Sequence, residues 1–167
     1  MGCLGVHFAL EEATVKKLRS LPTEEARLEY LQEEVEEEYF ESRQDWLAQT
    51  DKAWDAIHRA LTDGQLGWDN GSYPLNHVIL GGELLYTSDD YIMSLKTLAQ
   101  VRDIATALKD IGEEEFRSAY FQIDPESHGF VIDDEGFEYT WSWFQPLREF
   151  YSRAAAAGLY VLFTADQ

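Results

Sequence analysis

Short apolar runs lie near both ends of the chain and once in its middle, and their length is typical of buried strands. The first covers residues 4–9 and is followed by the acids Glu11 and Glu12. The second is Tyr91–Leu95 and the third is Leu159–Thr164. Runs of this length, bounded by glycines or charged residues, favour strands over helices. The pattern therefore predicts a small sheet that includes strands from both ends of the chain.

Elsewhere, apolar residues recur every three or four positions, which predicts amphipathic helices. A first helix ends at about Leu21, because Pro22 cannot continue it. A second begins after Thr23, which is a suitable N-cap. Its apolar stripe comprises Leu28, Leu31, Val35 and Tyr39. Acidic residues occupy most of its remaining surface, so one face is expected to pack and the other to be solvated.

Four more helices are predicted between residues 51 and 123. The first spans Asp51–Thr62, and the next is a short apolar helix that begins at Pro74 and is ended by a pair of glycines. Thr97 and Gln100 have the spacing of a capping box and open a helix that runs to residue 111. The last covers residues 113–123.

The segment Phe137–Trp143 alternates aromatic and polar residues, which is the period of a strand, but it runs directly into a helical pattern that includes Leu147. Pro146 fits two interpretations. It either starts a helix after a strand, or it interrupts one continuous helix, since it lacks an N–H group. The pattern alone leaves both open.

Several landmarks resemble the YfbM-like bacterial family, called domain of unknown function 1877. They are Asp51–Thr62 with Gly64 after it, Ile79–Glu83, the helix start at Thr97–Val101, and Leu147–Tyr151 continuing to Gly158. Their order and spacing cover nearly the whole chain. The resemblance implies an α+β fold and a helical segment before Gly158, hence a long C-terminal helix kinked at Pro146. It implies no activity, because the function of the family is not established.

Length and composition limit the classes of protein further. The 167 residues suit a single compact domain over residues 1–167, with several helices packed on the small sheet. The net charge of −19 disfavours binding to nucleic acid or to an anionic membrane surface. Cys3 is the single cysteine, and the N-terminus lacks a signal-peptide pattern, so we expect a cytoplasmic protein.

The predicted helix Asp51–Thr62 carries the best candidates for chemistry. Asp51, Trp54 and His58 lie along one side of it, with Lys52 one position away. A carboxylate beside a histidine is how a general acid or base is built, so Asp51 and His58 are candidate catalytic residues and Lys52 and Trp54 candidate pocket-lining residues. The alternative, which we favour about two to one, is an ordinary amphipathic helix whose Trp and His pack in the core. His77 is a further pocket-lining candidate, although a core position suits it better.

No metal site and no cofactor are expected. None of the four histidines is paired at the i, i+4 spacing of helical ligands. Asp124–Glu135 partly resembles a calcium-binding EF-hand loop, with Asp124, Gly129 and Glu135 at positions one, six and twelve. Its middle positions are unsuitable, since His128 offers nitrogen where calcium needs oxygen, so a chance resemblance is favoured.

Two functional hypotheses remain. The leading one is a non-enzymatic interaction protein, such as an inhibitor or immunity protein, that binds a basic protein partner through an acidic surface. Its partner-binding candidates are Glu33, Glu34, Glu36, Glu37 and Glu38. The alternative is a small-molecule-binding protein or enzyme with a pocket at Asp51, Trp54 and His58. A His58 that faces a cleft with a carboxylate within hydrogen-bond reach would favour the alternative.

Overall fold

The computed structural model describes residues 3–166, which form an α+β domain around one antiparallel sheet. The strand order is β2-β1-β5-β4-β3, so the two end strands of the chain, β1 and β5, pair at the centre. The strands are β1 (Gly5–Leu10), β2 (Leu47–Asp51), β3 (Glu83–Tyr86), β4 (Tyr91–Lys96) and β5 (Tyr160–Asp166). The predicted sheet with strands from both ends of the chain is confirmed.

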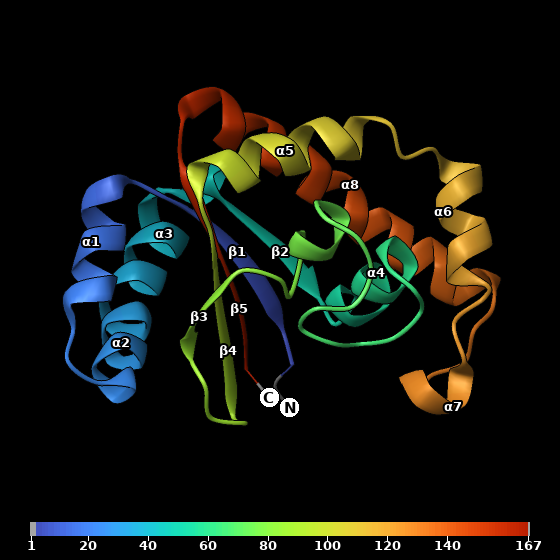
Figure 1. The fold of residues 1–167 in the computed structure, drawn as a ribbon, viewed down its shortest axis with the longest axis horizontal. Helices are drawn as coiled ribbons and strands as arrows, with labels where there is room; N and C mark the ends of the chain where they lie inside the picture. The colour runs from blue at the N-terminus through green and yellow to red at the C-terminus, as the bar shows by residue number, and fades with distance from the viewer. Residues whose placement is uncertain (1–2, 167) are drawn as a thin grey trace.

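Helices cover both faces of the sheet (Figure 1). One face carries α1 (Glu12–Ser20), α2 (Glu24–Tyr30) and α3 (Glu36–Ser42). The other face and its flank carry α4 (Trp54–Leu61), α5 (Leu98–Lys109), α6 (Glu113–Tyr120), α7 (Pro125–His128) and α8 (Asp134–Ala157). Because side chains alternate along a strand, β5 contributes Val161 and Phe163 to the α4–α8 core and Leu162 to the α1–α3 core.

The predicted second helix is present, with a change of winding in its middle. Thr23 caps it as expected, because its hydroxyl accepts a hydrogen bond from the Ala26 N–H at 3.1 Å. A π-helical turn, Leu31–Val35, separates α2 from α3. Buried residues in this region follow a spacing of four, and one wider turn keeps Leu31, Val35 and Tyr39 directed at the sheet. The predicted capping box at Thr97 and Gln100 is also confirmed.

Three local predictions were wrong. Asp51 does not begin a helix: it ends β2, and α4 starts at Trp54. β2 and β3 were missed, since neither is a long apolar run. The short apolar helix after Pro74 is only a 3₁₀ turn, Leu75–His77, because the following residues leave helical hydrogen bonding to enter the core.

The C-terminal helix resolves the ambiguity around Phe137–Trp143. α8 is one continuous helix that contains Pro146, so the resemblance was right and the strand period was misleading. Its buried side is made by residues three or four apart, which hold the helix against α5 and the sheet. These are Phe137, Phe144, Leu147, Phe150, Tyr151 and Ala154.

A buried polar cluster fixes the chain after the 3₁₀ turn. His7 Nε2 donates a hydrogen bond to the Val78 carbonyl at 2.9 Å, and the Tyr151 hydroxyl donates to the same oxygen at 2.7 Å. Lys96 Nζ donates to the Ile79 carbonyl at 2.6 Å. Burial lowers the pKa of His7 to about 3 and moves the pKa of Lys96 well below and that of Tyr151 well above their usual ranges. His7 and Tyr151 therefore act as neutral hydrogen-bonding groups at neutral pH.

Candidate ligand-binding pocket

A pocket of about 460 Å³ opens beside the first turns of α4 and α8. Its walls come from four segments: the junction of β2 with α4, the end of α6, the linker between α7 and α8, and the start of α8. Most of its surface is apolar, and the polar groups that line it include Lys52, His128 and Tyr139. A concave, mostly apolar site with a few polar groups is the usual form of a small-molecule site.

Local sequence signals position these walls. Gly129 has φ 86° and ends α7, which turns the chain so that Phe130 and Val131 form the rim with exposed fractions of 61% and 73%. α8 begins after Asp133, whose carboxylate accepts a hydrogen bond from the Gly136 N–H at 2.8 Å. Gly136 is required because a Cβ there would collide with the Tyr120 hydroxyl. α8 and α6 can therefore approach closely at the base of the pocket.

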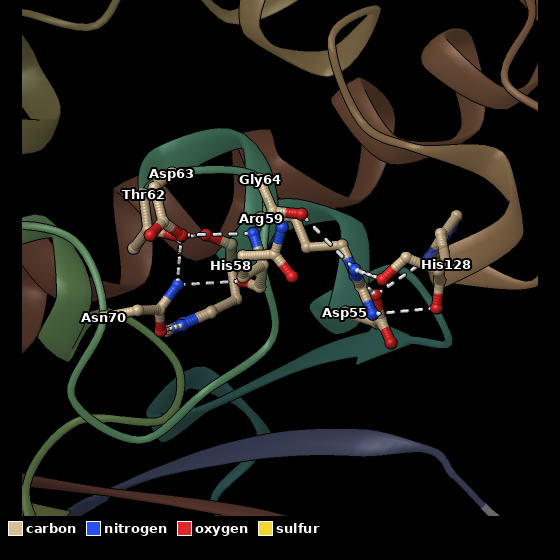
Figure 2. A network of polar contacts seen from close by, with 10 residues as sticks. Asp55, His58, Arg59, Thr62, Asp63, Gly64, Asn70 and His128 are labelled. Carbon is tan, nitrogen blue, oxygen red and sulfur yellow. Dashed lines mark hydrogen bonds and ion pairs between the residues drawn. The ribbon is translucent and has the colours of Figure 1, made fainter.

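His128 is held in the pocket wall by a carboxylate that is itself paired. Its Nδ1 donates a hydrogen bond to Asp55 Oδ1 at 2.8 Å, and Arg59 Nε donates to the same oxygen at 2.6 Å (Figure 2). Arg59 also donates to the Ser127 hydroxyl at 3.1 Å, which ties α7 to α4. Burial alone would raise the pKa of Asp55, but the bonds from His128 and Arg59 outweigh it and lower the pKa. The bond to Asp55 orients the His128 ring and engages its Nδ1, so Nε2 is the nitrogen left for another partner.

Tyr139 is the second oriented polar group. Its hydroxyl donates a hydrogen bond to the Asp51 carboxylate and accepts one from the Lys52 N–H at 3.2 Å. Burial and the bond to Asp51 raise the pKa of Tyr139 to about 12, so it stays protonated. Asp51 has φ 50°, in the left-handed region that Asp adopts more readily than most residues other than glycine. This turn ends β2 and places the Asp51 carboxylate against Tyr139.

The predicted site residues divide between the pocket and the core. Lys52 lines the pocket, and Asp51 supports it through Tyr139. Trp54 is buried, donates a hydrogen bond to the Cys3 carbonyl at 2.7 Å and packs on Phe163. It does not line the pocket.

His58 and His77 also lie outside this pocket. His58 is fully buried, and its Nε2 is bonded to Asn70 Oδ1 at 3.0 Å rather than to a carboxylate, as the left half of Figure 2 shows. Burial lowers its pKa, which keeps it neutral. His77 is half-buried and bonded to Asn76 at 2.7 Å. In the tertiary structure the candidate for acid–base chemistry is therefore His128 instead of His58, and the two lie on different sides of α4 (Figure 2).

Sequence reasoning missed His128 and Tyr139. His128 was weighed only as a metal ligand, and Tyr139 only as part of an alternating pattern. Both partners of these residues, Asp55 and Asp51, lie more than 70 residues away in the sequence. One local signal was available. Gly129 and the large apolar residues Phe130 and Val131 follow His128 in a turn-rich segment, where exposed Phe and Val are unusual.

The five glutamates of the acidic helix are not equivalent. Glu33, Glu34 and Glu37 are exposed, and none is in an ion pair among residues 3–166. Glu36 accepts a hydrogen bond from the Tyr91 hydroxyl at 2.9 Å, and its burial raises its pKa. Glu38 lies 3.5 Å from Arg43. These residues cover the face opposite the pocket.

Over residues 3–166, no three His, Cys, Asp or Glu side chains converge into a group that could hold a metal ion. No helix in this range combines the length and apolar character needed to cross a membrane.

The protein is an α+β domain with helices on both faces of its sheet, and its candidate small-molecule site is the pocket on the α4–α8 side. The chain belongs to the DUF1877 family, a domain of unknown function, which matches residues 1–164. The resemblance seen in the sequence is confirmed.

Among solved structures, the chain is similar to the Escherichia coli protein YfbM, described as a protein of unknown function. The two are 18% identical, with a TM-score of 0.61 over 97% of this chain and 99% of that one. This likeness shows the fold alone. No curated protein sequence matches the chain.

Proposed function

We propose that this protein binds a small molecule in the pocket between α4, α7 and α8. The observation that carries the proposal is the union of an apolar cavity of about 460 Å³ with two polar groups, His128 and Tyr139, each oriented by a carboxylate from behind. The volume lies within the usual range of roughly 300–1,000 Å³ for ligand sites.

The orientation of these groups supports binding over simple packing. A hydrogen bond to a ligand contributes more to affinity when its protein partner is already ordered, and Asp55 and Asp51 supply that order in advance. The cost is a buried charged pair, Asp55 with Arg59. His128 Nε2 can accept a proton or a hydrogen bond, so the same geometry is compatible with proton transfer to or from a ligand.

A fragment screen by amide NMR tests the proposal. We expect fragments to shift amides of the pocket walls in the wild type and to lose this effect in Ala56→Phe, which fills the pocket from α4. Ala156→Phe, on the exposed far end of α8, is the matched control and should bind as the wild type does. Because Ala56 is buried, Val131→Lys at the exposed rim is a second variant with little risk to folding. Fragment shifts that are absent, or that persist in both pocket variants, would refute a site here.

We propose, as a second candidate, recognition of a basic protein partner by the acidic helix. The observation in its favour is that Glu33, Glu34 and Glu37 are exposed without ion-pair partners within the described residues, so their charge is available to a cation. Changing all three to Gln should abolish co-purification of basic proteins. The same change at Glu113, Glu114 and Glu115, exposed in the first turn of α6, removes equal charge and should preserve it. Equal losses in both variants would indicate unspecific attraction.

A further inference from the structure

The charged groups that line the pocket favour a cation. Asp133 and Glu135 supply two carboxylates, against the single ammonium of Lys52. Behind the wall, Asp55 is compensated by Arg59, whereas Asp51 is bonded only to the uncharged hydroxyl of Tyr139 among the side chains described. A net charge of −19 over the whole chain adds a long-range attraction for cations, which a low-dielectric cleft concentrates.

The rings in the pocket favour the same charge. Tyr120, Phe130 and Tyr139 all line it. The face of an aromatic ring carries negative charge density, so it attracts a cation whose hydration shell has been lost, and aromatic rings with carboxylates are how proteins recognise ammonium groups. Phe130 is 61% exposed although it is a large apolar residue. Its ring is tilted against that of His128, with the centroids 5.1 Å apart, and the rest of its surface is open to a ligand at the rim.

We infer that the ligand of this pocket is a small organic ammonium ion, a substituted amine or quaternary ammonium with an apolar or aromatic body. The inference rests on the proposed binding function and names the class of ligand. The apolar body would lie against Ala53, Ala56 and Val131, and the cationic group against the rings and Glu135. The N-terminal end of α8 does not reverse this preference, because Asp133, Asp134 and Glu135 offset its positive dipole.

Two compounds of the same shape test the charge directly: meta-hydroxyphenyltrimethylammonium and meta-tert-butylphenol, which differ in a single positive charge. Titration calorimetry and amide NMR would measure their affinity for the full chain. We expect the cation to bind about ten-fold more tightly, which is the scale of one cation–π contact with one nearby carboxylate. Glu135→Gln and Phe130→Ala should each weaken the cation several-fold, and Glu135→Gln should leave the phenol unchanged.

Glu138→Gln is the matched control, since Glu138 is exposed on α8, three residues from Glu135, and does not line the pocket. Equal weakening by Glu135→Gln and Glu138→Gln would overturn the inference, because it would reveal general attraction instead of a contact in the pocket. If both compounds bind with equal affinity and Ala56→Phe abolishes the binding of both, the inference of a cationic ligand is overturned, but the proposed binding function stands. Absence of binding by either compound overturns the inference, and the fragment screen then decides the proposed function separately.

Discussion

His7 is expected to make the stability of this protein fall as the pH is lowered. Its ring lies between β1 and α8, in edge contact with Tyr151 and tilted against Phe163. Nε2 is bonded to the Val78 carbonyl, but Nδ1 is buried and has no partner within residues 3–166, so a second proton on the ring would have no acceptor there. Burial, and to a smaller extent the nearby Lys96, lower its pKa from 6.5 to about 3.

The sign and size follow from proton linkage. Below the unfolded pKa of 6.5 the unfolded chain binds a proton that the folded chain does not, so stability is complete above this pH and is lost as the pH falls towards 3. Between about pH 7.5 and about pH 5, His7 alone should remove about 2 kcal/mol from the free energy of unfolding. This is a large part of the roughly 5–15 kcal/mol that stabilises a typical domain.

His7→Phe isolates this contribution. Phe keeps an aromatic ring in place and removes the titrating nitrogens, while the Val78 carbonyl retains its bond from Tyr151 at 2.7 Å. The larger ring strains the core by an amount that does not depend on pH. The free energy of unfolding of wild type and variant would be measured by urea denaturation at both pH values.

The expected result concerns the difference in free energy of unfolding between wild type and His7→Phe, which should change between the two pH values. Relative to the wild type, His7→Phe should gain about 2 kcal/mol on going from about pH 7.5 to about pH 5. Carboxylates and His58 contribute to both proteins and cancel. A difference that stays constant to within about 0.5 kcal/mol would show that protonated His7 is accommodated in the fold, and would refute the assignment of its pKa to burial.

Two further predictions concern the elements around the pocket and the sheet. Asp55→Ala leaves the buried guanidinium of Arg59 without its carboxylate and should lower the free energy of unfolding by about 2–4 kcal/mol. Asp134→Ala removes an exposed ion pair and should lower it by less than about 1 kcal/mol. Urea denaturation would measure both, and similar losses would show that the pair at Asp55 is only a surface contact. Thr97→Ala removes the capping box of α5 and should lower the thermal midpoint, with a cost of about 1 kcal/mol, and an unchanged midpoint would contradict a stabilising cap.

Much of the fold was predictable because its signals are local. Thr23 and Thr97 mark helix starts through hydrogen bonds that close within three residues. The central strands β1, β4 and β5 were predicted because both of their faces are buried, which requires continuous apolar runs. The edge strands β2 and β3 were missed, since an edge strand contains exposed residues and is short.

The pocket was not predictable in the same way. His128 depends on Asp55 in α4, and Tyr139 depends on Asp51 at the end of β2. Neither pair leaves a periodic trace in the sequence, because the contacts form only when α7 packs on α4 and α8 packs on β2. In a chain with 32 acidic residues, no single carboxylate stands out as a partner.

The sequence by itself determined the class of fold, the capped helix starts at Thr23 and Thr97, the three buried strands and the strong negative charge. Only the tertiary structure decided which histidine lines the pocket and which is sealed in the core. It buried His58 against Asn70 and left His128, on the opposite side of α4, at the wall of an open pocket. The physical reason is that burial and hydrogen-bond partners are properties of packed elements, and both histidines look alike until those elements are placed together.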